Sequence, residues 1–369
     1  MTLDENQRIG QLLCVSLSGE ALTRTEREML ARIQPGGVIL FARNCQSPQQ
    51  VRALTDDLRA ELGAETLIAI DQEGGKVDRL RAFVTPMPAA EEVAVRGGAQ
   101  AAATLGKLTA RALRLLGLNF NFAPVLDVLT PARRELRNGL QSRTFGETPQ
   151  KVAECATAYL RALQEGEISG CVKHFPGLGG AEVDPHHKLP IVAVSREEFE
   201  AVDLGPFRAV FASGLARAVM VSHAAYPNLN QQGGADENVP ASLSKHIVTD
   251  LLRGECGFDG VALTDDLTMG AAITAAGSLP QAACRAVAAG HDLLLLCAAP
   301  EQIIEAHAAL RQQCSQGDIN PAHLEQSFQR LERLRRVCAK PERFDEEHLQ
   351  AISTQLSALH ADLGVDQGD

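Results

Sequence analysis

Eight short apolar runs alternate along the chain with longer segments of helical pattern, and this alternation constrains the fold more than any other feature. The runs are continuously apolar, which is typical of strands buried on both faces. Strands separated by helices pair in parallel through crossovers, and about eight such units close into a barrel. We therefore predict an α/β fold, a (β/α)8 TIM-type barrel. The expected strands are Leu12–Leu17, Gly37–Phe41, Leu67–Ile70, Asn119–Pro124, Gly170–Lys173, Ala218–Val221, Gly260–Thr264 and Asp292–Cys297.

The segments between and after these strands predict the helices. No linker, low-complexity segment or internal repeat marks a second domain, so we expect a single barrel domain over residues 1–369, with its core at about 8–340. The loop Asn228–Asn238 is interpreted as an insertion after the sixth strand. The helices expected between strands are Pro48–Leu62, Gly97–Leu116, Pro149–Glu165, Glu197–Ser213, Ser244–Arg253 and Gln281–Ala289, followed by the outer helices Glu301–Gln313, Pro321–Val337 and Glu346–His360.

Charge and cysteine content exclude several classes of protein. The formal net charge of −11 disfavours binding to nucleic acid or to an anionic membrane surface. The polar N-terminus carries no targeting signal, and the apolar run Leu12–Leu17 is too short to span a membrane. Nine cysteines without CxxC spacing indicate reduced thiols. We therefore expect a cytoplasmic protein with no cofactor and no metal, and a monomer or weak dimer.

Polar side chains collect where the predicted strands end. Asp71 and Glu73 follow the third strand, Asp127 the fourth, Lys173-His174 the fifth, His223 the sixth, and Asp265-Asp266 the seventh. Catalytic groups of a barrel come from the carboxyl ends of its strands, and so many charges on one rim are costly without a function. The alternative for Asp265 and Asp266 is that both cap the following helix.

The glycine-rich segment after Lys173-His174 carries Asp184-Pro185-His186. A carboxylate two residues from an imidazole can bind it and raise its proton affinity, as a general acid/base requires. Two alternatives remain open: a metal site built from His174, His186, His187 and a carboxylate, or an exposed histidine without a role. The glycines predict freedom of motion in the first part of this loop, whereas Pro185 restricts the part that carries His186.

The turn after the third strand is suited to binding hydroxyl groups. Asp71 can accept hydrogen bonds from two vicinal hydroxyls, Arg79 can donate from the same turn, and Gly74-Gly75 permits a tight backbone. The spacing of these glycines is not that of a phosphate-binding P-loop. Because aromatic residues make up only 4% of the chain and Trp is absent, a sugar would be held by hydrogen bonds in one tight pocket.

Taken together, these segments resemble the family 3 glycoside hydrolases, and most closely the bacterial β-N-acetylhexosaminidases of peptidoglycan recycling. They occur in the family's order over about residues 8–300, and Lys-His-Phe-Pro-Gly together with the Thr-Asp-Asp-Leu strand end is the most specific part. The resembling segments are Gly36–Arg43, Ile70–Gly75, Asn121–Asp127, Arg143–Gly146, Lys173–Gly177, Asp184–His186 and Phe258–Leu267.

The resemblance implies a role for each matching residue. Asp265 is similar to the nucleophile, and Asp184 with His186 to the general acid/base dyad of a retaining, two-step mechanism. The substrate implied is a small cell-wall (muropeptide) fragment, cleaved by an exo-acting β-N-acetylglucosaminidase. The residues similar to those that hold the terminal N-acetylglucosamine are Asp71, Arg79, Arg143, Lys173 and His174.

Three departures from the family pattern accompany the resemblance. Related enzymes usually have His where this chain has Leu178, a small residue such as Ser where it has Pro185, and Arg where it has Lys76. None of these removes a proposed catalytic residue. The alternatives are a β-glycosidase or glycoside phosphorylase of the same family, a metal-dependent hydrolase, and an inactive sugar-binding barrel.

Overall fold

Eight parallel strands form the centre of the protein in a computed structural model that describes residues 5–182, 189–229, 238–338 and 340–366. They pair in the order β7-β6-β5-β4-β3-β2-β1-β8, and the bridge between Leu263 and Leu293 joins the two ends into a nearly closed barrel. The predicted barrel and all eight predicted strands are confirmed. The strands are β1 (Leu13–Ser16), β2 (Gly37–Leu40), β3 (Leu67–Ile70), β4 (Phe120–Asn121), β5 (Ser169–Phe175), β6 (Ala218–Val221), β7 (Val261–Thr264) and β8 (Leu294–Leu296).

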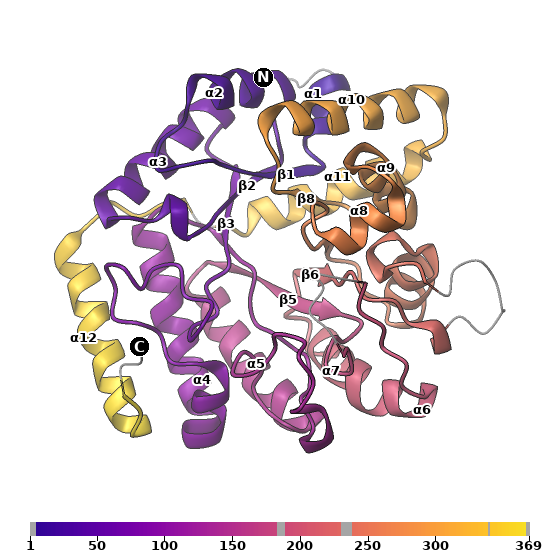
Figure 1. The fold of residues 1–369 in the computed structure, drawn as a ribbon. Coiled ribbons are helices and arrows are strands. Elements are labelled where there is room, and N and C mark those ends of the chain that lie inside the picture. Colours follow the sequence, from indigo (N-terminus) through magenta and orange to yellow (C-terminus); the bar gives the residue numbers. More distant parts are fainter. Residues whose placement is uncertain (1–4, 183–188, 230–237, 339, 367–369) are drawn as a thin grey trace.

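Helices surround the strands on all sides in the view of Figure 1. The helices are α1 (Glu5–Gly10), α2 (Arg24–Ile33), α3 (Pro48–Leu62), α4 (Ala90–Leu115), α5 (Pro149–Glu165), α6 (Arg196–Glu198), α7 (Leu204–Ala212), α8 (Gly270–Ala276), α9 (Leu279–Ala289), α10 (Pro300–Gln316), α11 (Pro321–Arg336) and α12 (Glu346–Leu363). The 3-10 and π-helical segments are η1 (Ala42–Asn44), η2 (Pro131–Arg133), η3 (Phe199–Asp203), η4 (Pro227–Leu229), η5 (Ala241–Leu243) and η6 (His246–Glu255).

Capping residues set the starts of the best-predicted helices. The side chains of Ser47 and Thr148 accept backbone N–H groups in the first turns of α3 and α5, and a proline at the first helical position presets its φ. The helix α4 begins at Ala90 rather than at the predicted Gly97, because it continues across a break at Gly98, where φ is 60°. The helix α2 is not among those expected.

The C-terminal helices lie outside the barrel, as predicted. Of these, α12 packs against α4 along the flank of the molecule (Figure 1). No helix in the described ranges combines the length and the apolar character that crossing a bilayer requires.

The residues of the strands are buried. One irregularity in their pairing concerns the site. The register between β5 and β6 shifts between Val172 and Phe175. Lys173 and His174 lie at this shift, at the carboxyl end of β5. The strand that carries the most specific sequence motif is thus locally distorted where its polar residues meet the rim.

Candidate active site

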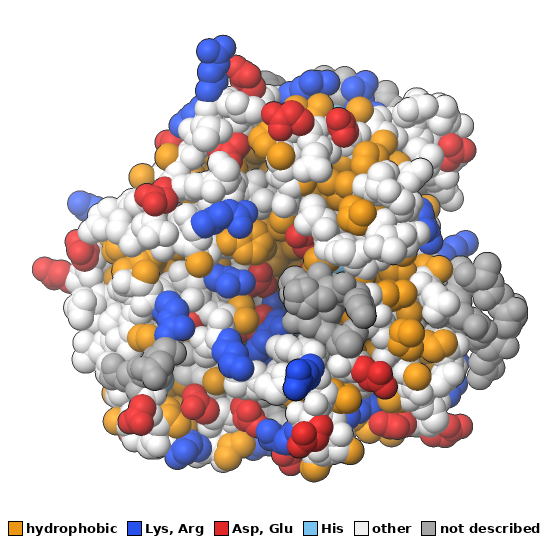
Figure 2. Space-filling view, viewed as in Figure 1, with side chains coloured by type: hydrophobic (Ala, Val, Ile, Leu, Met, Phe, Trp, Pro, Cys, Tyr) orange, Lys and Arg blue, Asp and Glu red, His pale blue; other side chains and the backbone are white. Residues whose placement is uncertain are grey.

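A cavity of about 220 Å³ opens at the carboxyl ends of the strands. Figure 2 shows a hollow near the centre of this face, with Lys and Arg side chains gathered beside it. Every predicted site residue that the structure describes lines the cavity. Its lining residues are Phe41, Asp71, Glu73, Val77, Arg79, Asn138, Arg143, Lys173, His174, Leu178, Met220, Asp265, Asp266, Met269 and Leu295. Two larger surface hollows, of about 530 and 490 Å³, contain none of the predicted residues.

Lys173 is the centre of a charged cluster in this cavity. Its Nζ lies 2.7 Å from Asp71 Oδ1 and 2.5 Å from Glu73 Oε1, and only 3% of its side chain is exposed. Burial by itself lowers the pKa of Lys173, but the two carboxylates outweigh burial and raise that pKa above its ordinary value. Lys173 is therefore a fixed cation that holds Asp71 in the cavity wall.

Glu73 joins Lys173 to Arg143. The Arg143 guanidinium donates from Nε and Nη2 to the two Glu73 oxygens at 2.8 and 2.9 Å, a bidentate pair. Burial raises the pKa of Glu73, but the charges of Arg143 and Lys173 outweigh it and hold that pKa far below its ordinary value. Sequence spacing puts Glu73 at the strand end but assigns it no role, because spacing alone does not show which carboxylate meets which cation.

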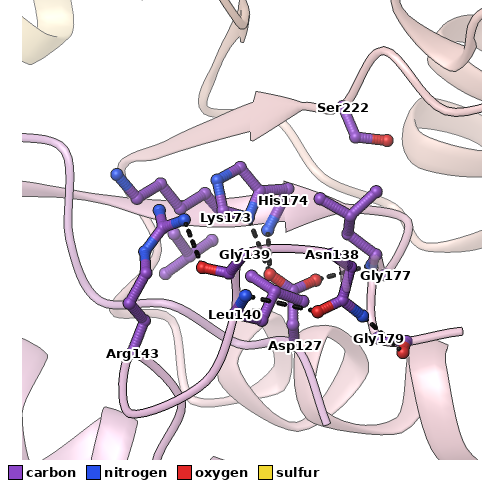
Figure 3. A network of polar contacts seen from close by, with 12 residues as sticks. Asp127, Asn138, Gly139, Leu140, Arg143, Lys173, His174, Gly177, Gly179 and Ser222 are labelled. Carbon is purple, nitrogen blue, oxygen red and sulfur yellow. Dashed lines mark hydrogen bonds and ion pairs between the residues drawn. The ribbon is translucent and has the colours of Figure 1, made fainter. Parts of the chain in front are cut away.

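His174 is oriented by Asp127, another strand-end residue to which sequence spacing assigns no role. Asp127 Oδ2 lies 2.7 Å from His174 Nδ1, and the carboxylate is completely buried (Figure 3). Because a carboxylate only accepts, Nδ1 carries the proton and Nε2 is the ring nitrogen left for a ligand. The imidazole is thus presented to the cavity in one fixed orientation.

Arg79 has no carboxylate partner among the described residues. Its guanidinium lies 5.8 Å from the centre of the Phe41 ring, and its buried Nε has no hydrogen-bond partner within the described part of the chain. The backbone N–H of Arg79 donates to Gln72 Oε1, which fixes the turn. The guanidinium is therefore available to donate to a ligand, and its role in binding stays a prediction.

The two adjacent carboxylates after β7 have different surroundings. Asp266 Oδ1 accepts from the backbone N–H groups of Thr268 and Cys297 at 3.0 and 3.1 Å, and Oδ2 accepts from the Thr268 hydroxyl at 2.6 Å. Its carboxylate is therefore committed to holding the loop. These partners lie outside the following helix α8, whose N-cap residue is Met269 with no side-chain cap hydrogen bond, so the capping alternative is wrong for Asp266.

Asp265 keeps one oxygen free. Its Oδ1 accepts the backbone N–H of Asp266 at 2.8 Å, and Oδ2 has no hydrogen-bond partner among the described residues. Burial raises the pKa of Asp265, but His223, His174, the Asp266 N–H and Lys173 outweigh it and lower that pKa below its ordinary value. An ionised carboxylate with an unengaged oxygen is what a nucleophile requires.

His223 stabilises the backbone at Asp265 and Asp266. It is fully buried, its Nδ1 lies 2.7 Å from the Ser242 hydroxyl, and its Nε2 donates to the Asp266 carbonyl at 2.8 Å. The backbone that carries the Asp265 carboxylate is held before it by the bond of the Asp265 N–H to the Val221 carbonyl and after it by the bond of His223 to the Asp266 carbonyl.

The predicted acid/base residues Asp184 and His186, with Pro185 and His187, lie outside the described residues. Their roles and the metal alternative stay predictions. The described start of this loop gives its glycines a packing role. A Cβ on Gly177 would lie 2.6 Å from Asp203 Cβ, and one on Gly179 would lie 2.1 Å from the Val128 carbonyl oxygen.

A (β/α)8 barrel with an ionised, partly free carboxylate facing a polar cavity has the architecture of a barrel enzyme. The chain belongs to glycosyl hydrolase family 3, whose N-terminal domain is matched by residues 2–334. The predicted family is thereby confirmed.

Named relatives and solved structures agree with this assignment. A protein of Alkalilimnicola ehrlichii named beta-hexosaminidase is 38% identical over 297 residues, which cover 79% of this chain and 82% of the relative. A Pseudomonas aeruginosa PAO1 protein of the same name is 38% identical over 288 residues, covering 77% of this chain and 82% of the relative.

Two solved structures are also similar. NagZ from Neisseria gonorrhoeae, in complex with N-trifluoroacetyl-D-glucosamine, superposes with a TM-score of 0.76 at 30% identity, covering 96% of this chain and 97% of that one. A family 3 beta-N-acetylglucosaminidase from Paenibacillus sp. gives a TM-score of 0.85 at 32% identity, covering 97% of this chain and 69% of that one.

Proposed function

We propose that this family 3 member is a retaining, exo-acting β-N-acetylglucosaminidase that releases terminal N-acetylglucosamine from small cell-wall fragments. The observation that carries the proposal is the free Oδ2 of an ionised Asp265, in a cavity walled by Asp71, Arg79 and Lys173. The names of the relatives supply the sugar class.

The size of the cavity supports exo action. Pockets for drug-sized ligands occupy roughly 300–1,000 Å³, and the cavity here measures about 220 Å³. It has room for one sugar ring, with the leaving group outside. The carboxylate of Asp71, the guanidinium of Arg79 and Nε2 of His174 provide the acceptors and donors that the ring hydroxyls need.

In the proposed mechanism, Asp265 attacks the anomeric carbon and forms a covalent glycosyl-enzyme while a general acid protonates the leaving oxygen. His186, paired with Asp184, is proposed as that acid, and as the base that deprotonates water in the second step. The substrate oxygen leaves as an alcohol, and water restores free Asp265. Asp265 inverts the anomeric carbon in the first step, and water inverts it again by attacking from the opposite face, so the β configuration is retained.

A panel of nitrophenyl β-glycosides that differ only at the 2-position tests the sugar class. We expect the highest kcat/KM for the 2-acetamido sugar, and a higher value for the glucoside would overturn the proposal. Product analysis in phosphate buffer separates hydrolysis from phosphorolysis, because sugar-1-phosphate as the main product would indicate a phosphorylase. Peptide mapping after inactivation with a fluorinated N-acetylglucosaminyl fluoride should locate the label on Asp265; a label on Asp266 would refute the assignment.

A further inference from the structure

Three consecutive residues, Gly177, Leu178 and Gly179, are each held by a side chain from another part of the rim. The Tyr226 hydroxyl donates to the Gly177 carbonyl at 2.9 Å. The Leu178 N–H donates to Asp127 at 2.6 Å, and Asn138 Nδ2 donates to the Gly179 carbonyl at 3.0 Å (Figure 3). The chain that leaves β5 toward Asp184 therefore starts from a fixed platform.

Asp127 divides its two oxygens between this platform and the sugar-facing histidine. Oδ2 accepts from His174 Nδ1 at 2.7 Å, and Oδ1 accepts from the Leu178 N–H. The carboxylate has no exposed surface, and a buried charge is costly unless hydrogen bonds compensate it. Losing either hydrogen bond would cost free energy, because the buried carboxylate would be less well compensated. A shift of His174 is therefore coupled to a shift of Leu178 through Asp127.

Asp127 also fixes the proton on His174. With Nδ1–H donating to the carboxylate, Nε2 is the ring nitrogen that remains for a ligand hydroxyl in the cavity. An asparagine in place of Asp127 can accept only one of these two hydrogen bonds, because its NH2 group is a donor. If its oxygen accepts from Leu178, its NH2 faces His174 Nδ1 and favours the opposite tautomer.

Asn138 forms a second, separate brace. Its Oδ1 accepts from the Leu140 N–H at 3.2 Å while Nδ2 holds Gly179, and Arg143 Nη1 donates to the Gly139 carbonyl at 3.3 Å (Figure 3). Asn138 thus connects the loop platform to the turn that carries Arg143. It has no hydrogen bond to His174 among the described residues, so the two braces can be tested independently.

We propose that Asp127 and Asn138 are positioning residues, which hold the start of the acid/base loop in register with the sugar-binding groups His174 and Arg143. The proposal rests on the proposed function, because it takes the loop beyond Gly180 to carry the general acid. It predicts that loosening the platform impairs protonation of the leaving group more than it impairs sugar binding.

The test compares Asn138→Ala with Asn119→Ala as the matched control. Both asparagines are 2% exposed, and both donate from Nδ2 to a backbone carbonyl and accept a backbone N–H, but Asn119 does so between β3 and β4, outside the cavity lining. For Asn138→Ala we expect kcat to fall about tenfold more with an alkyl leaving group than with nitrophenol. This is a fraction of the roughly 10²–10⁴-fold rate acceleration that a general acid contributes. Inhibition by N-acetylglucosamine should change less than twofold. For Asn119→Ala we expect a lower Tm and equal changes with both leaving groups.

Asp127→Asn tests the link to His174. We expect 15N NMR of ring-labelled protein to show His174 moving from the Nδ1–H to the Nε2–H form, with weaker N-acetylglucosamine inhibition as well as lower kcat. The proposal would be overturned if Asp127→Asn left both the His174 tautomer and the inhibition constant of N-acetylglucosamine unchanged. It would also be overturned if Asn138→Ala and Asn119→Ala showed equal leaving-group effects. Failure of the proposed function would be distinct, because the wild type would then lack hexosaminidase activity while the tautomer of His174 remained measurable.

Discussion

Replacing Glu73 should destabilise the protein more than replacing any exposed acidic residue. Its side chain is 3% exposed and neutralises Arg143 and Lys173 together. In Glu73→Ala, Lys173 keeps Asp71 at 2.7 Å, but Arg143 keeps only the Gly139 carbonyl at 3.3 Å. The main cost is therefore one unpaired, largely buried guanidinium.

Removing one partner of a buried ion pair costs about 3–5 kcal/mol. The Arg143 side chain is 19% exposed, so water compensates part of its charge, and we expect a value near the lower end for Glu73→Ala. Glu73→Gln keeps one acceptor oxygen and should cost about 1 kcal/mol less. As a control, Glu28→Ala breaks an exposed i,i+4 pair with Arg24 and should cost about 0.3–0.5 kcal/mol.

Urea unfolding followed by far-UV circular dichroism is the suitable assay, because the chain has no Trp. The pKa of Glu73 is depressed in the folded state, so its stabilisation is complete above the unfolded pKa of about 4.3 and is lost as pH falls toward the folded pKa. The gap between wild type and Glu73→Gln should therefore be constant near pH 7 and narrow below about pH 4. A Glu73→Ala cost equal to that of Glu28→Ala would refute this account of the charged cluster.

Three further substitutions test the catalytic assignments. Asp265→Asn should nearly abolish turnover with little change in Tm, whereas Asp266→Asn should lower Tm because Asp266 holds Thr268 and Cys297; the reverse pattern would exchange their roles. His186→Ala should slow hydrolysis of alkyl glycosides by about 10²–10⁴-fold and of nitrophenyl glycosides much less, and equal losses across a leaving-group series would exclude it as the general acid.

The strands and most of the site could be predicted because each depends on a local signal. A buried parallel strand must be continuously apolar, and barrel closure brings all carboxyl ends to one rim. Asp71 and Asp265 directly follow β3 and β7, and Lys173 lies near the carboxyl end of β5, so predicting the barrel also predicts that they converge. Their convergence needed no knowledge of side-chain partners.

The hydrogen-bond and ion-pair partners of the site residues could not be predicted. Sequence spacing alone left Asp265 and Asp266 equivalent. The family resemblance favoured Asp265, and the hydrogen bonds of Asp266 to Thr268 and Cys297 supply the physical difference between the two. Asp127 and Glu73 stood at strand ends without roles, because their partners come from other loops. The helix α2 was missed although Thr23 and Glu26 form a capping box, a signal that short helices with few apolar residues still carry.

The glycines after β5 show where a sequence signal has two opposite meanings, and Gly179→Ala separates them. If Gly179 only gave the loop freedom, alanine would reduce the entropy of the unfolded chain and stabilise the protein by about 0.4–1 kcal/mol. In the structure, a Cβ at this position would lie 2.1 Å from the Val128 carbonyl oxygen, a backbone atom that cannot rotate away. Overpacking of this kind costs about 1–3 kcal/mol, so we expect a lower Tm and, because Gly179 also accepts from Asn138, a lower kcat. Gly19→Ala is the control, since a Cβ there would meet no atom within 4 Å. The sign of the Tm change decides: a rise in Gly179→Ala would restore the interpretation of a freely moving loop, and a fall would show that these glycines permit close packing against the rim.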